Sequence, residues 1–335
     1  MSITVSSDVA KALDEGRPVV ALETAVLTCG LPRQPWQDRF GEAPSYVGHE
    51  TPINQAAAAA MTAAVNRGGC VAAWIAIVDG VLRIGLAPDE LVALAANMDA
   101  SKVSLATIAA AMRAGASAGT TVATTLLACG RAETPIRAFA TGGIGGLHRD
   151  WARHLDISAD LAALATNPVC VVASGCKSIL DISATVEAIE SIGVPVVGMG
   201  TDWFPRFVEA NSVDDPGISR LDDPSAIAEL CRVHWDELGQ RSAVLVTKPV
   251  PADTAIARGS LEGVIEAAER SWRDSGDPGY SRTPVLLTAL AEATQGLSLR
   301  ANLTLLIENA AAAARIACDG LYSPSRDQGQ RGSGT

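Results

Sequence analysis

Residues 169–198 read VCVVASGCKSILDISATVEAIESIGVPVVG. The apolar runs Val169–Ala173 and Val194–Gly198 are typical of buried strands, and the segment Ser178–Ile192 between them is typical of a helix. Strands that alternate with helices pack as a sheet covered by helices. This stretch therefore predicts an α/β fold.

The same alternation extends through most of the chain. Further strands are predicted at Val19–Leu22, Val71–Val78, Ile136–Ala140 and Ala243–Thr247. Further helices are predicted at Ile53–Arg67, Pro88–Met98, Pro224–Leu238, Thr254–Trp272, Pro284–Thr294 and Leu299–Cys318. We expect one α/β/α domain over residues 1–322, with helices on both faces of its sheet, followed by a disordered tail at Ser323–Thr335.

Composition and charge exclude several classes of protein. The chain has 335 residues and is 48% hydrophobic, so it can bury a large core. A net charge of −11 argues against a nucleic-acid partner but allows a small phosphorylated ligand. Seven cysteines without CxxC spacing are expected to be reduced thiols of a cytoplasmic protein. No signal peptide and no membrane span is predicted.

Lysine is rare in this sequence. Only four of the 26 basic residues are lysines: Lys11, Lys102, Lys177 and Lys248. A buried lysine can lose its proton, whereas arginine cannot, so retained lysines are candidate nucleophiles or phosphate ligands. Lys177 follows a predicted strand and precedes a predicted helix, a position that favours a neutral amine able to form a Schiff base. The alternative is a lysine that extends to solvent at a helix start.

Glu23 directly follows the apolar run Val19–Leu22. A carboxyl group at the end of a buried strand is partly desolvated, and its pKa should rise toward the range of a general acid. The alternative is a glutamate at a strand end that faces water.

Two turns could bind an anion through their backbone N–H groups. Thr141–Arg149 reads TGGIGGLHR, and its His148 and Arg149 add charge. It departs from the dinucleotide-binding pattern because the third glycine is missing, which makes a dehydrogenase the weakest alternative. The second turn, Gly119–Val122, carries two threonine hydroxyl groups.

The stretch Asp156–Asp160 places two carboxylates and a hydroxyl close together. Oxygen ligands of this kind suit Mg²⁺ or Mn²⁺. The same pattern also serves as the N-cap of a helix that begins near Leu161.

The segment Arg33–Thr51 has no clean period and separates the first predicted strand from the first long helix. It carries three aromatic residues, Trp36, Phe40 and Tyr46. A loop of this length is either functional, for example as a lid over an acceptor, or a surface insertion without a role.

Several motifs occur together in a characteristic order. Glu23, Lys102, GTTV, TGGIGGLHR, DISADL and GCKSILD together resemble the pseudouridine-5′-phosphate glycosidase family, from about Pro18 to Ala317. The resemblance implies an α/β/α domain with a large mixed central sheet, assembled as a homotrimer. It also implies an enzyme that reversibly cleaves a C–C glycosidic bond to ribose 5-phosphate through a lysine Schiff base.

The resemblance implies a role for individual residues. Lys177 would be the nucleophile, Glu23 the proton-transfer partner and Asp156 the ligand of Mn²⁺ (or Mg²⁺). The implied substrate contacts are Lys102, Val122, Ser158, Ala159, Asp160 and Asn302. The predicted anion-binding turns add Thr121 and His148 as candidate contacts.

This sequence departs from the family pattern where a base would bind. The family's Ser-His-Gly-Met-Pro turn reads TCGLP at Thr28–Pro32, the Arg33–Thr51 insertion follows at once, and Lys102 precedes an apolar stretch. These changes disfavour uracil and favour a bulkier apolar acceptor. We therefore expect a C-glycosynthase that joins ribose 5-phosphate to an aromatic, polyketide-like aglycone in natural-product biosynthesis, as in the family's alnumycin-pathway branch. The alternatives are a pseudouridine-5′-phosphate glycosidase and a non-catalytic phosphosugar-binding protein.

Overall fold

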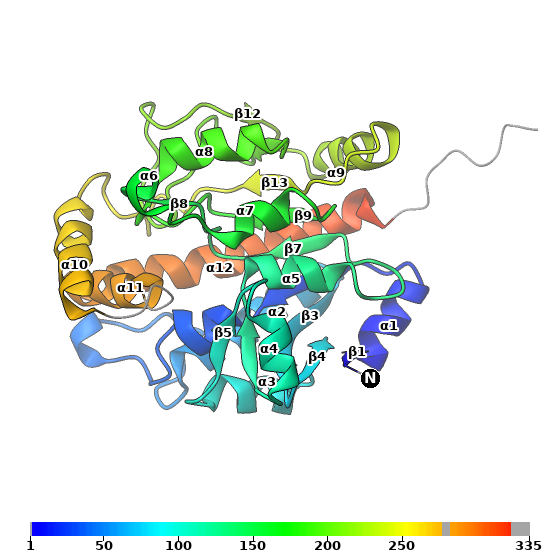
Figure 1. The fold of residues 1–335 in the computed structure, drawn as a ribbon, viewed down its shortest axis with the longest axis horizontal. Coiled ribbons are helices and arrows are strands. Elements are labelled where there is room, and N and C mark those ends of the chain that lie inside the picture. Colours follow the sequence, from blue (N-terminus) through cyan, green and yellow to red (C-terminus); the bar gives the residue numbers. More distant parts are fainter. Residues whose placement is uncertain (1, 277–281, 323–335) are drawn as a thin grey trace, which may run out of the picture.

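The computed structural model describes residues 2–276 and 282–322 (Figure 1). In this part of the chain an eleven-stranded mixed sheet follows the order β1-β4-β3-β2-β7-β9-β13-β11-β12, with β6 beside β3 and β5 beside β6. Most neighbours are parallel, whereas β3 runs antiparallel to β4 and β6. The predicted α/β fold with a large mixed sheet flanked by helices is confirmed.

The strands of this sheet are short, and two further strands, β8 and β10, pair with each other outside it. The strands are β1 Ile3–Val5, β2 Val19–Glu23, β3 Val71–Val78, β4 Val81–Ile84, β5 Ser101–Val103, β6 Ala118–Thr120, β7 Ala138–Ala140, β8 Leu147–His148, β9 Cys170–Ala173, β10 Leu180–Asp181, β11 Val196–Gly198, β12 Ser219–Arg220 and β13 Val244–Thr247. All six strands predicted from apolar runs are confirmed, each within two residues at either end.

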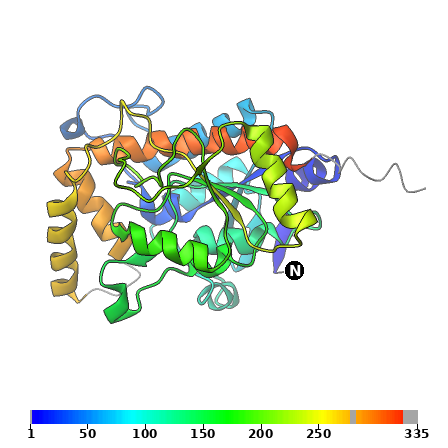
Figure 2. The same cartoon turned by 90° about the horizontal axis from the view of Figure 1, so that it is seen from above.

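Helices cover both faces of the sheet (Figures 1 and 2). They are α1 Ser7–Asp14, α2 Ile53–Arg67, α3 Pro88–Ala96, α4 Ile108–Arg113, α5 Val122–Cys129, α6 Trp151–His154, α7 Ala159–Leu164, α8 Ile182–Ser191, α9 Pro224–Arg232, α10 Glu262–Ser275, α11 Arg282–Ala293 and α12 Leu297–Ile316. Short helical turns are η1 Val26–Gly30, η2 Asp38–Phe40, η3 Val233–Glu237 and η5 Ala317–Leu321. Among the described residues, none of the helices has the length and apolar character needed to cross a bilayer.

Two predicted helix starts are wrong. The helix predicted from Ser178 begins at Ile182, because Leu180–Asp181 pair with β8 and the Asp181 side chain accepts from Ala184 N at the N-cap. The helix predicted from Thr254 begins only at Glu262. The tail predicted to be disordered, Ser323–Thr335, lies outside the described residues.

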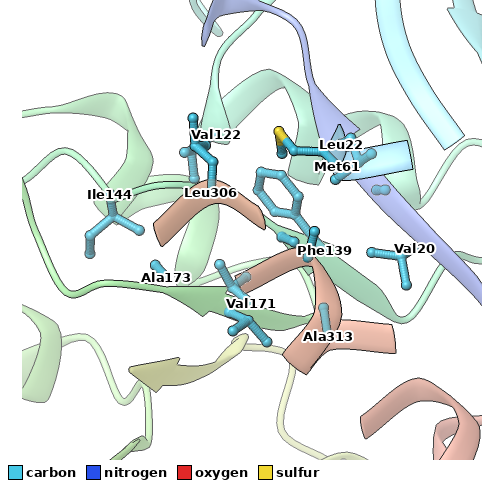
Figure 3. Close-up of a cluster of buried hydrophobic side chains, with 14 of the residues drawn as sticks. Val20, Leu22, Met61, Val122, Phe139, Ile144, Val171, Ala173, Leu306 and Ala313 are labelled. Carbon is cyan, nitrogen blue, oxygen red and sulfur yellow. The ribbon is translucent and has the colours of Figure 1, made fainter. Parts of the chain in front are cut away.

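The long helix α12 packs across the sheet and forms much of the core (Figure 2). It contacts α2 through small side chains, and a Cβ atom on Gly68 would lie only 2.6 Å from Ala314 Cβ. Figure 3 shows Phe139 of β7 between residues of β2 and α12. Complete burial of such a side chain contributes about 1.5–3 kcal/mol to stability.

The strand order reverses direction at β2. β3, β4 and β1 lie on one side of β2, whereas β7, β9, β13 and β11 extend the sheet on the other side. Such a reversal opens a crevice at the carboxyl ends of parallel strands. β2 ends at Glu23, β7 leads into Thr141, and β9 leads into the loop that carries Lys177, so the fold brings these residues to one edge.

The insertion at residues 33–51 lies against one end of the α11–α12 helix pair, where Figures 1 and 2 show the blue loop beside the orange helices. Arg39 forms a 2.5 Å ion pair with Glu292 of α11. Arg300 of α12 lies 5.4 Å over the ring of Trp36 and donates a hydrogen bond to the backbone of Glu42. The insertion is therefore bound to the helices and does not project freely into solvent.

Candidate active site

A cavity of about 290 Å³ opens at the carboxyl ends of β2, β7 and β9. Ten of the eleven predicted site residues line it, and Asp156 does not. The ten are Glu23, Lys102, Thr121, Val122, His148, Ser158, Ala159, Asp160, Lys177 and Asn302. Residues predicted from distant parts of the sequence thus surround one cavity.

Glu23 is buried at the end of β2, and its Oε1 accepts a 2.6 Å hydrogen bond from the hydroxyl of Thr141. Burial raises the pKa of this carboxyl group, while the nearby Lys177 and the Thr141 hydrogen bond act in the opposite direction. The predicted rise in pKa is confirmed in direction. The group is therefore suited to gain and lose a proton.

Lys177 is half-buried in the loop after β9. Gly175 lets the loop turn, because it adopts φ +66° and its missing Cβ atom would lie 1.8 Å from the carbonyl oxygen of Pro205. The loop is fastened to the glycine turn, since Ile144 N donates to Gly175 O at 3.0 Å and Lys177 N donates to Ile144 O at 3.3 Å. The strand end and the glycine turn thus position the lysine in the cavity.

Two further basic residues share the cavity with Lys177. Burial lowers the pKa of Lys102, and the positive charge of Lys177 lowers it further. Burial and the neighbouring Arg282 lower the pKa of His148 to about 4, so this ring is neutral at pH 7. Its buried Nδ1 has no hydrogen-bond partner in the described part of the chain. His148 therefore offers a ligand a neutral ring instead of the charge that was expected.

The carboxylate of Asp160 joins two segments of the cavity wall. Its Oδ1 accepts from Ala123 N at 2.9 Å and its Oδ2 accepts from Gly145 N at 2.8 Å. A Cβ atom on Gly145 would lie 2.3 Å from Ser158 Oγ, so glycine is required there. Ser158 caps α7 by accepting from Asp160 N, which confirms the helix-cap interpretation of this stretch.

Asp156, the predicted metal ligand, is bound to Arg282 by an ion pair. Arg282 is buried, and its Nε and Nη2 also donate to the carboxylate of the buried Glu269, at 2.7–3.1 Å. Among the residues that the structure describes, no group of three or more His, Cys, Asp or Glu side chains could hold a metal ion. The guanidinium of Arg282 already neutralises Asp156 and would repel a metal ion bound beside it. No chemical step is therefore assigned to a metal.

Two side chains with structural roles at the site were missed from the sequence. Asn309 of α12 is buried and donates to the carbonyl oxygen of Thr141 at 2.8 Å, which fixes the start of the glycine turn. Phe207 adopts φ +61°, an uncommon conformation for a bulky residue, and packs against Gly143. The amide in an otherwise apolar helical stretch was the signal for Asn309; Phe207 has no comparable signal.

Lys248 and the aromatic residues of the insertion lie outside the lining of this cavity. Lys248 lies outside the cavity in a 2.9 Å ion pair with Glu308. Of the three aromatic residues, Phe40 lines a second cavity next to the first. Trp36 contacts Phe40 edge to face at 5.9 Å between ring centres, whereas Tyr46 is partly exposed.

Known proteins are similar to this chain over almost its whole length. The family model described as indigoidine synthase A-like protein matches residues 44–319. A pseudouridine-5′-phosphate glycosidase from Myxococcus xanthus is 41% identical over 95% of this chain and 98% of its own length. One from Dinoroseobacter shibae is also 41% identical, over 94% of this chain and 96% of its own.

Two solved structures share the fold. The prealnumycin C-glycosynthase AlnA, in complex with ribulose 5-phosphate, is similar with a TM-score of 0.80 and 33% identity over 96% of this chain and 97% of its own. An indigoidine synthase A-like protein from Thermotoga maritima has a TM-score of 0.79 and 30% identity over 94% of this chain and 95% of its own.

Proposed function

We propose that this chain, which belongs to the indigoidine synthase A-like family, joins C1 of ribose 5-phosphate to a carbon of an aromatic acceptor. It is an enzyme of that family. Relatives of this chain are named pseudouridine-5′-phosphate glycosidase or prealnumycin C-glycosynthase, in agreement with the motif resemblance found in the sequence. The reaction would be a C-glycosynthase reaction with a polyketide-like aglycone in natural-product biosynthesis.

The chemistry starts with the amine of Lys177. It adds to the C1 aldehyde of the open sugar and expels water, which leaves an iminium carbon that accepts electrons. A carbon of the acceptor ring attacks C1, and the proton that this carbon loses passes to the carboxylate of Glu23. The sugar 4-hydroxyl then replaces the lysine nitrogen at C1, so the ring closes and the amine is released.

The reverse reaction uses the same groups. A C–C glycosidic bond has no leaving oxygen that an acid could protonate, so a pair of carboxylates alone cannot break it. The carboxyl group of Glu23 instead protonates the ring carbon while the iminium at Lys177 withdraws electrons from C1. Its raised pKa keeps a protonated fraction available for this step.

One observation carries the proposal. Glu23 and Lys177 line the same cavity, and the charge of Lys177 is the strongest influence opposing the effect of burial on the Glu23 carboxyl group. An amine and a proton-transfer group in one space are what the reaction requires. Lys102 supplies a second cation at the cavity wall for the sugar phosphate.

A second candidate function is the cleavage of pseudouridine 5′-phosphate to uracil and ribose 5-phosphate. It is favoured by the 41% identity to curated pseudouridine-5′-phosphate glycosidases over almost the whole chain. It uses Lys177 and Glu23 in the same way, so only the acceptor separates the two functions. Mn²⁺ and the homotrimer stay predictions from the resemblance.

Borohydride trapping tests the shared chemistry. Wild-type protein with ribose 5-phosphate should give a reduced adduct at Lys177, which mass spectrometry locates. Lys177→Ala should give none, whereas Lys248→Ala is a matched control because that lysine lies outside the cavity. Glu23→Gln should keep the adduct and lose turnover. An adduct that persists in Lys177→Ala contradicts the assignment.

Acceptor assays separate the two functions. The wild-type enzyme is incubated with ribose 5-phosphate and either uracil or a naphthoquinone-type aglycone. We expect a C-riboside of the aglycone. Rapid formation and cleavage of pseudouridine 5′-phosphate, with no aglycone product, would instead establish the glycosidase.

A further inference from the structure

A second cavity of about 520 Å³ adjoins the catalytic cavity, and five residues line both: Cys29, Gly30, Phe207, Leu287 and Asn302. We propose that this second cavity, here called the acceptor chamber, binds the fused aromatic body of a neutral acceptor of two or more rings. The inference rests on the proposed function and adds where the acceptor lies and what its shape must be.

The chamber has a mostly apolar wall built by three parts of the chain. The insertion and the turn before it supply Leu31 and Phe40, the segment between β11 and β12 supplies Val208, and the helix pair supplies Leu287, Leu290, Ala291 and Leu299. Phe40 is buried against Gly296, whose missing Cβ atom would lie 2.6 Å from Phe40 Cβ. An apolar wall with an aromatic side chain favours a flat apolar ligand.

The arginine side chains of the chamber are already bonded to other groups of the protein. Arg39 forms its ion pair with Glu292, and the guanidinium of Arg33 donates to the carbonyl oxygens of Thr28 and Asn97. The amides of Gln34 and Gln37 bind each other at 3.1 Å at the rim. The guanidinium groups of both arginines are therefore already engaged within the protein, and the amides of the chamber suit phenol or quinone oxygens.

The size of the chamber argues against a pyrimidine. Its volume of about 520 Å³ lies within the roughly 300–1,000 Å³ of pockets that enclose drug-sized ligands. A single six-membered ring would leave most of this space unfilled and would gain little from burial. Two or three fused rings would contact both the Phe40 wall and the helix wall.

The five shared residues lie where the two cavities adjoin. Cys29 and Gly30 are small and leave room for a ring, while Phe207, held at φ +61°, borders both cavities. Asn302 of α12 can hydrogen-bond to a substituent in either cavity. An acceptor in the chamber can thus place one ring edge beside Glu23 and Lys177 while its remaining rings stay outside the catalytic cavity.

The test uses 1-naphthol as a two-ring probe and uracil as a one-ring probe, with binding measured by saturation-transfer NMR and calorimetry. Both are measured on wild type and on Lys177→Ala, which cannot form the sugar adduct. Thr288 is exposed on α11 and lines the chamber, so Thr288→Trp should fill it without disturbing the core. Ala293→Trp, exposed on the same helix and outside the chamber lining, is the matched control.

We expect 1-naphthol to bind wild type and Lys177→Ala equally, and Thr288→Trp to weaken this binding at least tenfold. Ala293→Trp should change it less than twofold, and Phe40→Ala should weaken it as a second chamber variant. The borohydride-trapped adduct of ribose 5-phosphate should form normally in Thr288→Trp. No saturable binding of 1-naphthol, or equal binding by the two tryptophan variants, would overturn the inference. Failure of the proposed function would appear separately, as naphthol binding without any sugar adduct in wild type.

Discussion

The hydroxyl of Thr141 donates a 2.6 Å hydrogen bond to Oε1 of Glu23, across the boundary between β7 and β2. This bond favours the charged form of a carboxyl group that burial drives toward the neutral form. The proton affinity of Glu23 is therefore raised by burial and lowered by the charge of Lys177 and by this hydrogen bond.

Thr141→Val should move the pH profile of C-glycoside cleavage. Loss of the hydrogen bond raises the pKa of Glu23, and cleavage needs the protonated form, so the fall in kcat/KM at high pH should shift upward. A hydrogen bond to a charged group contributes about 1.5–3 kcal/mol, which corresponds to roughly one to two pH units. Thr247→Val, at a buried threonine of β13, is the control and should leave the profile unchanged. A profile unaltered by Thr141→Val would contradict the role of this bond.

His148→Gln should make stability less sensitive to acid. The pKa of His148 falls from 6.5 to about 4 in the folded protein, so the unfolded chain binds a proton that the folded protein does not. Stability linked to this group is therefore complete above pH 6.5 and is lost as the pH falls from 6.5 toward 4. The loss is at most ~3.5 kcal/mol, from about 1.4 kcal/mol per pH unit. Denaturant unfolding of both proteins at pH 7 and pH 4.5 measures the difference, and equal acid sensitivity would refute it.

Gly145→Ala should disable the sugar-binding side of the cavity. The new Cβ atom would lie 2.3 Å from Ser158 Oγ and 2.8 Å from Asp160 Oδ2, which breaks the bridge from Asp160 to Ala123 N. We expect affinity for ribose 5-phosphate to fall at least tenfold in calorimetry. The same substitution at Gly263, in α10 with nothing within 4 Å, should instead add about 0.5–1 kcal/mol of stability. Normal sugar binding by Gly145→Ala would show that the turn tolerates a side chain.

Mn²⁺ binding at Asp156 would have to compete with Arg282. We expect wild-type protein to bind Mn²⁺ weakly and Arg282→Gln to bind it at least tenfold more tightly, with Asp156→Asn removing binding in both backgrounds. Calorimetry or the paramagnetic resonance of Mn²⁺ measures this without reference to turnover. Tight binding by wild type that Arg282→Gln leaves unchanged would show that the ion pair does not block the ligand.

Arg282→Gln should also lower the stability of the fold, so the stability of this variant is measured beside its metal binding. It leaves the buried carboxylate of Glu269 without its main partner, and breaking a buried ion pair in this way costs about 3–5 kcal/mol. Glu269→Gln combined with Arg282→Gln should recover part of this loss. The metal measurements are therefore made well below the unfolding temperature of each variant.

The parts of the site that follow buried strands were predictable from the sequence. Glu23 and Lys177 each stand after an apolar β-branched run, and parallel strands place such ends at one edge. Strands without an apolar run, such as Ser101–Val103 and Ala118–Thr120, were not found because each is only three residues long and gains its stability from pairing.

Contacts between distant segments account for what local patterns could not predict. The residues after Lys177 were expected to be helical, but Leu180 pairs with His148, a partner 32 residues earlier. Asp156 stays a predicted metal ligand, and its ion pair with Arg282, 126 residues away in the sequence, was not foreseen. Local patterns carry no signal for either partner, because both contacts depend on the tertiary structure.

The sugar half and the acceptor half of the site differ in how much the rest of the molecule constrains them. Around Gly145 even one added methyl group meets the side chains of Ser158 and Asp160. The wall formed by residues 33–40 contacts α11 and α12 through the exposed ion pair of Arg39 with Glu292 and through the buried ring of Phe40. Under the proposed function, an exchange of this segment that keeps Phe40 should alter the choice of acceptor, while Glu23 and Lys177 stay untouched.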